Sequence, residues 1–182
     1  MLSNLDDSVG EILKKVEKED LENDTLVFFL SDNGGPTKEL TSSNLPLRGG
    51  KGQMYEGGIR VPFLFKWPSK VPAGKTYDRP VLSTDIFATI HAAAGVPKPK
   101  GEYIESYDLL PYLTGKHKED PHEWLYWRQS HKAAFRVGDM KILRQSPKKW
   151  ELYDLAKDPS ETKDLSKEMP EQLNLLYASW EK

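Results

Sequence analysis

The sequence predicts an α/β body followed by a small antiparallel β-sheet with a C-terminal helix. Three observations support this fold class. An amphipathic segment precedes a short apolar strand at residues 25–30, a second strand and helix follow over 59–67 and 82–94, and short strand-like segments begin near residue 121. An apolar strand next to helical segments is typical of α/β proteins, in which helices cover the sheet. We therefore expect a body over residues 1–120 and a subdomain over residues 121–182.

Residues 6–21 have the pattern of an amphipathic helix. Its apolar residues recur at spacings of three and four: Val9, Ile12, Leu13 and Val16. Asp6 or Asp7 is the expected N-cap, because a short carboxylate accepts a hydrogen bond from the first unpaired N–H groups of a helix. The run TLVFFL at 25–30 is continuous and apolar, which is typical of a strand buried on both faces.

The body contains two further predicted elements. The run IRVPFLFKW at 59–67 is rich in β-branched and aromatic residues and predicts a strand. Residues 82–94 predict a helix that Ser83 or Thr84 caps and Gly95 ends, since glycine is favoured just after a helix.

After residue 121 the pattern changes to short strands. The predicted strands are 124–127, 133–137, 140–143 and 150–155. Gly138-Asp139 is the clearest hairpin signal among them. Residues 169–180 then predict a helix with one apolar face. The tail therefore reads as a small antiparallel sheet with a terminal helix.

Composition excludes several classes of protein. With 26 basic and 28 acidic residues the net charge is -2, so the basic footprint of a nucleic-acid-binding protein is missing. There is no cysteine, so these residues form no disulfide and supply no cysteine nucleophile. No apolar run approaches the roughly 20 residues of a membrane span, and residues 1–7 lack the order of a signal peptide. We expect a soluble, mildly acidic globular chain.

The segment Ser31-Asp32-Asn33-Gly34 directly follows the strand predicted at 25–30. In α/β folds, ligands are held at the carboxyl ends of strands. The Asp32 carboxylate and the Asn33 amide each offer a hard oxygen, which suits Ca²⁺ or Mg²⁺ better than Zn²⁺. The alternative is an ordinary turn in which both side chains bond to nearby backbone.

A glycine-rich segment over 47–60 surrounds Lys51. Gly50 and Gly52 let the backbone approach a ligand closely and leave the ammonium group unobstructed, which suits a tetrahedral oxyanion such as sulfate or phosphate. The segment is not a Walker P-loop, because Leu45 stands where a glycine is required and Gly52 replaces the Ser or Thr after the lysine. The alternative is a flexible surface loop.

Together these motifs resemble the C-terminal portion of the type I sulfatases, a family of the alkaline phosphatase superfamily. The resemblance is carried by the strand at 25–30, SDNG at 31–34, GKG at 50–52, YEGGIRVP at 55–62, AFRVGDMK at 134–141, ELYDL at 151–155, Asp158-Pro159 and Glu161. It implies the C-terminal part of an alkaline-phosphatase-like α/β sandwich, followed by the small sheet and helix.

The resemblance implies roles for particular residues. Asp32 and Asn33 would complete a Ca²⁺ site that holds the sulfate group. Lys51 would contact the sulfate ester and stabilise charge in the transition state. Three more residues match the flanking pattern and are interpreted as groups that brace the loop: Arg48, Glu56 and Arg60.

The family's nucleophile has no counterpart in this sequence. It is a formylglycine made from Cys or Ser in a Cys/Ser-x-Pro-x-Arg sequence. The nearest match, SNLPLR at 43–48, has one residue too many before the proline. Asp6-Asp7 is interpreted as a helix cap and not as the family's paired metal-binding aspartates. We therefore expect the nucleophile to lie outside this chain, the Ca²⁺ site to be incomplete, and the isolated chain to be inactive.

The leading hypothesis is a sulfuric ester hydrolase that acts on a sulfated small molecule or glycan. The alternatives are a phosphomonoester or phosphonate ester hydrolase of the same superfamily, and a non-catalytic remnant that binds metal or a sulfated glycan. The strand at 25–30 requires neighbours on both sides, which predicts self-association through the truncated sheet. Family members are often periplasmic, secreted or lysosomal, and the sequence itself indicates no compartment.

Overall fold

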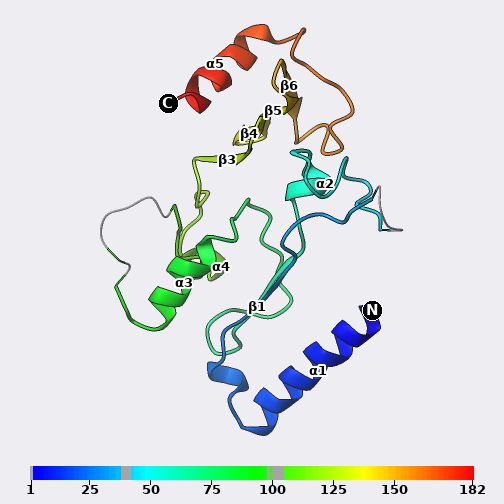
Figure 1. The fold of residues 1–182 in the computed structure, drawn as a ribbon. Helices are drawn as coiled ribbons and strands as arrows, with labels where there is room; N and C mark the ends of the chain where they lie inside the picture. The colour runs from blue at the N-terminus through cyan, green and yellow to red at the C-terminus, as the bar shows by residue number, and fades with distance from the viewer. Residues whose placement is uncertain (1, 38–41, 98, 100–104) are drawn as a thin grey trace. The chain divides into compact units, whose positions relative to one another are not determined.

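A computed structural model describes residues 2–37, 42–97, 99 and 105–182 (Figure 1). The chain divides into two compact units, one formed by residues 1–29 and 63–122 and the other by residues 30–62 and 123–182. The division into a body and a subdomain at residue 121 stays a prediction. No helix in the described part of the chain is long and apolar enough to cross a membrane.

The first unit begins with helix α1, Leu2–Lys18. The helix starts before Asp6 and Asp7, so the prediction that one of them is the N-cap was wrong. The physical reason is that the spacing of apolar residues extends back through Leu5 and Leu2, which continue the same helical face. No residue of α1 is buried. A 3₁₀ turn, η1 (Glu22–Asp24), follows the helix.

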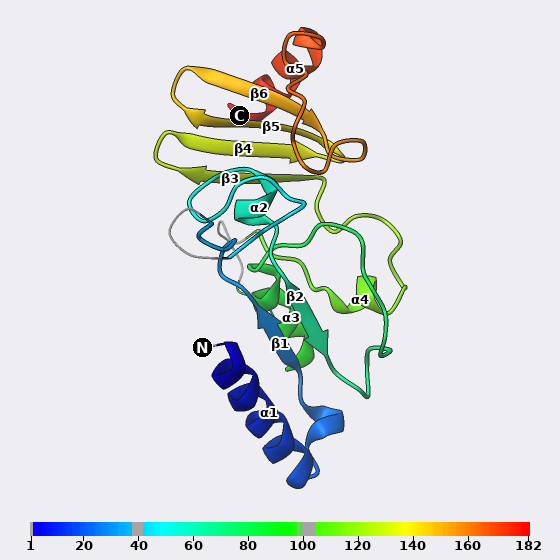
Figure 2. The same cartoon turned by 90° about the vertical axis from the view of Figure 1, so that its right-hand side faces the viewer.

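Strands β1 (Val27–Leu30) and β2 (Phe63–Lys66) form a two-stranded sheet, drawn as antiparallel arrows in Figure 2. The Phe28 ring lies 6.0 Å from that of Phe63 and 5.0 Å from that of Phe65. The expectation that β1 is buried on both faces was wrong. Successive side chains of a strand point to opposite faces of the sheet. Phe28 packs against Phe63 and Phe65, and Phe29, on the other face, is 41% exposed.

Helix α3 (Asp85–Ala93) lies inside the predicted range 82–94. Thr84 occupies the N-cap position, yet its side chain makes no cap hydrogen bond. Its hydroxyl donates instead to the Glu105 carbonyl at 3.0 Å. Gly95 follows the helix with a φ of +65°, so the predicted glycine stop is confirmed.

The buried carboxylate of Asp85 organises the segments around α3. It accepts hydrogen bonds from the N–H groups of Leu82 at 2.8 Å and Tyr107 at 2.9 Å, and it contacts Nε2 of His122 at 2.8 Å. Asp85 is fully buried and His122 nearly so. His122 is therefore a packing residue of the first unit. A short helix, α4 (Leu110–Leu113), completes this unit.

The second unit contains the predicted small sheet. Its strands are β3 (Trp124–Gln129), β4 (Lys132–Val137), β5 (Met140–Ser146) and β6 (Lys149–Asp154). They pair antiparallel in sequence order, as Figure 2 shows. Val137 pairs with Met140 across the Gly138-Asp139 turn, and Gly138 has a φ of +56°. The sheet, its hairpin signal and the terminal helix α5 (Pro170–Trp180) are confirmed.

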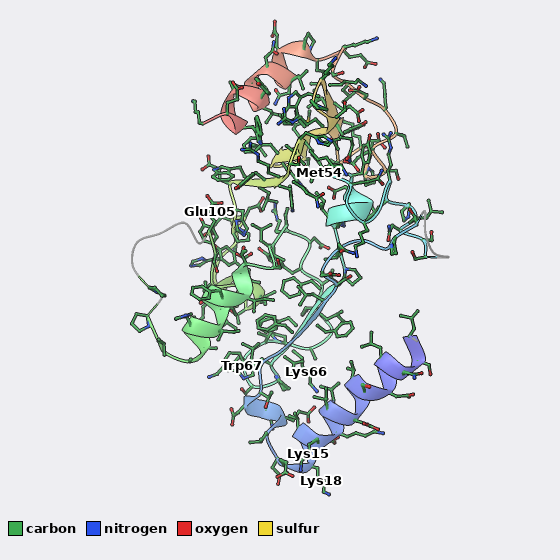
Figure 3. The ribbon with its side chains drawn as sticks, viewed as in Figure 1. Lys15, Lys18, Met54, Lys66, Trp67 and Glu105 are labelled. Atoms are coloured by element: carbon green, nitrogen blue, oxygen red, sulfur yellow. The ribbon has the colours of Figure 1, made fainter. Side chains whose placement is uncertain are left out.

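Both faces of this sheet are covered within the second unit, because side chains alternate along each strand. Helix α5 covers one face, where a core forms from Phe135, Ile142, Leu152 and Leu176. The segment that ends in helix α2 (Glu56–Ile59) covers the other face, where a core forms from Met54, Tyr55, Ala134, Leu143, Tyr153 and Leu155. Figure 1 shows α5 and α2 on opposite sides of the sheet, and Figure 3 labels Met54 beside α2.

Asp164 anchors the connection between β6 and α5. Its carboxylate accepts hydrogen bonds from the N–H groups of Ser166 at 3.0 Å and Leu152 at 3.2 Å, and from Nζ of Lys149 at 3.0 Å. Partial burial works to raise the pKa of Asp164, but these hydrogen bonds outweigh it and lower the pKa to about 2.

This lowered pKa predicts an acid-dependent loss of stability. A carboxylate whose pKa is lower in the folded state stabilises the fold above its unfolded pKa of about 4, and the contribution disappears as the pH falls toward about 2. We expect Asp164→Asn to lower the free energy of unfolding by up to about 2 kcal/mol near neutral pH and by much less near about pH 2.5. Urea unfolding of both proteins across this range measures the difference. A difference that stays constant with pH would contradict the prediction.

Candidate functional site

The turn after β1 is held by short local hydrogen bonds. The Ser31 N–H donates to the Pro62 carbonyl at 3.2 Å, and the Ser31 hydroxyl donates to the Asn33 carbonyl at 2.8 Å. Nδ2 of Asn33 donates to the Gly34 carbonyl at 3.0 Å, which leaves Oδ1 of Asn33 as an acceptor. Asp32 is exposed, and its carboxylate makes no hydrogen bond or ion pair with another of the residues that the structure describes.

Glycine backbone brings the two predicted motifs together. The Gly34 N–H donates to the Gly58 carbonyl at 3.0 Å, and the Lys51 N–H donates to the Gly35 carbonyl at 3.2 Å. A Cβ atom on Gly34 would lie 1.7 Å from the Gly57 carbonyl oxygen, and one on Gly50 would lie 2.4 Å from the Gly35 carbonyl oxygen. Glycine is therefore required at both positions, because no side chain fits between these backbones.

Asn44 ties the two motifs together and was not singled out from the sequence. Its Oδ1 accepts from the Gly35 N–H at 3.0 Å. Its Nδ2 donates to the carbonyls of Gly35 and Gly49, each at 3.0 Å. One amide side chain therefore joins the turn after Asn33 to the loop before Lys51, and it uses both its acceptor and its donor to do so.

The loop around Lys51 is a tight, braced turn. Gly52 has a φ of +76°, a conformation that favours glycine. The Gly50 N–H donates to Oε1 of Gln53 at 3.0 Å, and Nζ of Lys132 donates to the Gly52 carbonyl at 2.6 Å. These contacts do not fit the alternative of a flexible surface loop. The Lys51 side chain is exposed at the turn.

Two of the three residues interpreted as braces do brace the loop. NH1 of Arg48 donates to the Glu161 carbonyl at 2.8 Å and to the Tyr153 hydroxyl at 3.1 Å. Oε1 of Glu56 accepts from Nζ of Lys141 at 2.8 Å. Arg60 differs, because its side chain is exposed and makes no such bond among the described residues.

Glu56, Lys141 and Glu161 form a buried charged cluster, called the ion cluster below. Their exposed fractions are 3%, 0% and 0%. Nζ of Lys141 also lies 2.8 Å from Oε1 of Glu161, as an ion pair without hydrogen-bond alignment. Oε2 of Glu161 accepts from the Glu56 N–H at 2.6 Å. Burial raises the pKa of Glu161, although Lys141 acts to lower it.

A second polar network lies beside the ion cluster. The hydroxyls of Tyr55 and Tyr153 both donate to Oε2 of Glu151, at 2.9 and 2.8 Å. The Arg48 guanidinium lies 4.0 Å from the centre of the Tyr55 ring. Burial, together with the nearby Glu151 carboxylate, raises the pKa of Tyr55 to about 12 and raises that of Tyr153 as well. Both tyrosines therefore stay protonated as donors at neutral pH.

Asp32 and Asn33 match part of a hard-cation site. Their carboxylate and amide oxygens are the donor types that Ca²⁺ prefers, but Ca²⁺ takes about six to eight oxygens. Within the described residues, no group of three or more His, Cys, Asp or Glu side chains lies close enough together to hold a metal ion. The two residues fit the ion as a partial ligand set.

The fold and the loop geometry define a class: an α/β protein with a glycine-cradled lysine beside a turn that carries oxygen ligands. Two family models match the chain. The sulfatase model matches residues 1–96, and the model of the C-terminal part of N-sulphoglucosamine sulphohydrolase matches residues 50–177. The chain belongs to the sulfatase family. The predicted resemblance to the C-terminal portion of a type I sulfatase is thereby confirmed.

Individual proteins agree with this family. The chain is 40% identical over 132 residues to human steryl-sulfatase, a match that covers 69% of this chain and 23% of the relative. It is 29% identical over 198 residues to N-acetylgalactosamine-6-O-sulfatase of Bacteroides thetaiotaomicron, covering 94% of this chain and 38% of the relative.

A solved structure gives the same result. The crystal structure of Ps i-CgsB in complex with k-i-k-neocarrahexaose matches with a TM-score of 0.89 and 32% identity, covering 100% of this chain and 41% of that chain. The predicted α/β fold with its small terminal sheet is confirmed. The chain spans about a quarter to two fifths of the length of these proteins.

Because of the close contact at Gly34, we predict that one added methyl group there lowers the free energy of unfolding more than the same change at an open position. We expect Gly34→Ala to lower the free energy of unfolding by about 2–3 kcal/mol, because a Cβ atom there forces the Gly57 backbone to move. Gly10→Ala in α1 is the control, because a Cβ atom at Gly10 meets no atom within 4 Å. Alanine favours a helix, so this control should be neutral or stabilising by up to about 1 kcal/mol. Denaturant unfolding compares the two, and equal effects would refute the role of the contact.

Proposed function

We propose that this chain supplies one part of the active site of a sulfate-ester hydrolase. In this proposal Asp32 and Asn33 give oxygen ligands to a Ca²⁺ ion, and Lys51 gives a positive charge to the sulfate group. The observation that supports it best is the pair of backbone bonds on adjacent glycines. Gly34 N–H bonds to the Gly58 carbonyl at 3.0 Å, and the Gly35 carbonyl accepts from Lys51 N–H at 3.2 Å. The first bond joins the turn after Asn33 to α2, and the second joins that turn to the Lys51 loop.

The residues would act by holding and stabilising negative charge. A sulfate ester undergoing hydrolysis carries charge on its sulfuryl oxygens, and a fixed cation beside them stabilises the transition state. The Lys51 ammonium, on a turn braced by Lys132 and Gln53, meets that requirement. A bound Ca²⁺ would supply further charge and would orient the ester. Exposed Asp32 and the Oδ1 atom of Asn33 are available as ligands for it.

The covalent step is proposed to belong to a formylglycine that lies outside these 182 residues. The chain contains no cysteine, and the one phrase that approaches the required pattern, SNLPLR at 43–48, instead supplies Asn44 and Arg48 as structural contacts. The isolated chain is therefore proposed to bind sulfate without hydrolysing esters. Self-association through the β1–β2 sheet belongs to the same proposal, and Phe29 is exposed there.

The substrate is proposed to be a sulfated small molecule or glycan. The relatives act on different kinds of molecule by name, a steryl-sulfatase and an N-acetylgalactosamine-6-O-sulfatase, and one solved neighbour is in complex with a neocarrahexaose. The names that these relatives share are those of sulfatases, which supports a sulfate ester as the reacting group but does not indicate the molecule that carries it.

Anion binding by the chain tests the role of Lys51. We expect inorganic sulfate to shift the amide signals of Gly50, Lys51 and Gly52 in ¹H–¹⁵N NMR spectra. Lys51→Met should weaken this binding by at least about tenfold, because a hydrogen bond to a charged group contributes about 1.5–3 kcal/mol. Lys148→Met, at the exposed turn between β5 and β6, is the matched control and should bind sulfate as the wild type does.

The outcomes of this titration separate the hypotheses. Equal sulfate affinity in wild type and Lys51→Met would overturn the assignment of Lys51. A parallel titration with inorganic phosphate tests the phosphoester alternative, which requires phosphate to bind more tightly than sulfate at the same signals. Ca²⁺ titrations of wild type and Asp32→Ala test the ligand assignment, because loss of the carboxylate should abolish any Ca²⁺-dependent shift of the Asn33 and Gly34 amides.

A turnover assay tests the location of the nucleophile. We expect the 182-residue chain to leave an aryl sulfate intact at any Ca²⁺ concentration, since no described residue supplies the covalent intermediate. Release of the aryl alcohol above the buffer background, lost again in Lys51→Met, would show that a nucleophile is present and would refute this part of the proposal.

A further inference from the structure

The geometry points to Lys141 and Glu161 as positioning residues for the sulfate site. Through the ion cluster they fix the position of α2, and α2 in turn fixes the positions of the Asp32-Asn33 turn and the Lys51 loop. This inference rests on the proposed function. Neither residue was assigned a role from the sequence. Both contact Glu56, and Glu161 also contacts Arg48.

The ion cluster holds one positive and two negative side chains and is costly to bury. Lys141 faces two carboxylates, those of Glu56 and Glu161, each at 2.8 Å. NH1 of Arg136 lies 3.9 Å from Oε2 of Glu56 and brings the second positive charge. Well-packed apolar side chains are often as stabilising as a buried ion pair. The contribution of this cluster is therefore its directional contacts, which fix one arrangement of the groups that it joins.

Helix α2 depends on those contacts for its position. It has four residues, two of them the glycines Gly57 and Gly58, and a helix this short and glycine-rich does not form on its own. The cluster holds its first residue twice, because Glu161 accepts the Glu56 N–H at 2.6 Å and Lys141 bonds the Glu56 carboxylate. The start of α2 is thereby fixed to the sheet through β5.

Glycine contacts carry that position to the candidate site. The Gly57 N–H donates to the Arg48 carbonyl at 2.8 Å, and the Gly58 carbonyl accepts from the Gly34 N–H at 3.0 Å. Arg48 is itself held by the Glu161 carbonyl at 2.8 Å. No side chain separates these backbones, so a movement of α2 is passed on rather than absorbed.

The contacts also show why Glu161 serves both motifs. Its carboxylate holds α2, which contacts the turn after Asn33. Its backbone carbonyl accepts a hydrogen bond from Arg48, which lies at the start of the loop that contains Lys51. One buried residue thus holds the two segments that the proposed chemistry needs side by side.

The test compares the ion cluster with an equally buried site on the other face of the sheet. Lys141→Met removes the positive charge from the cluster. Leu152→Ala removes packing from the core under α5, which does not include the cluster. Both variants should lower stability. We expect Lys141→Met to weaken sulfate binding by about tenfold, whereas Leu152→Ala should change it by less than about twofold.

Amide hydrogen exchange supplies a readout that does not depend on sulfate. In Lys141→Met the amides of Gly34, Lys51 and Gly57 should exchange at least about tenfold faster relative to those of β4, because their hydrogen bonds depend on α2. In Leu152→Ala these amides should keep their ratio to β4. If the wild type binds no sulfate, the proposed function fails, and this exchange pattern still decides the positioning role.

A second, more conservative variant tests the inference in case Lys141→Met does not fold. Glu161→Gln keeps the size of the side chain and an acceptor for the Glu56 N–H but removes one charge of the ion pair. We expect an intermediate effect, about threefold on sulfate affinity and on the three exchange rates. Wild-type affinity and exchange ratios in either folded variant would overturn the inference. Failure of both variants to fold would overturn it too, because the cluster would then be needed for the fold as a whole.

Discussion

The backbones of Gly34 and Gly57 approach so closely that an added Cβ atom would fall 1.7 Å from a carbonyl oxygen. A second contact of the same kind joins Gly50 to the Gly35 carbonyl. Such contacts leave no adjustable side chain between the segments, so the relative position of the two motifs is set by whatever holds the backbones themselves. In this chain that is a set of hydrogen bonds from Asn44, Arg48 and the ion cluster.

The chemistry of the candidate site follows from this constraint. Asp32 and Lys51 are exposed and make few contacts of their own, so their side chains remain available for a ligand. Precision comes instead from the buried residues behind them. A site in which exposed groups are carried by a rigid glycine backbone keeps its ligands accessible while limiting the movement of their Cα atoms.

The sequence predicted the tail better than the site. Strands β3 to β6 are short segments separated by turns, and Gly138-Asp139 marks a hairpin between two of them, so local pattern was sufficient. Helix α2 was missed, because Gly57 and Gly58 are poor helix formers and the region reads as the start of a strand. The caps Asp6 and Asp7 were misplaced, since the apolar spacing of α1 continues past them.

The ion cluster could not be predicted from local pattern at all. Lys141 interrupts an apolar strand, which signals that a buried lysine needs a partner, but its partners Glu56 and Glu161 lie far away in the sequence. The same is true of Asn44, whose three hydrogen bonds depend on a turn formed by other segments. Asp32, Asn33 and Lys51 were singled out by residue type and position, and the family resemblance then favoured a functional role over an ordinary turn or loop. Their chemistry stays a proposal.

Because side chains of the β3–β6 sheet point to opposite faces, the two faces have different roles. Residues that point toward α5 hold the domain together, and residues that point toward α2 govern where the glycine loop rests. Substitutions on the face that packs against α5 can therefore change thermal stability and leave the position of the glycine loop unchanged. Substitutions on the face that packs against α2 can change the position of that loop with little effect on the core under α5.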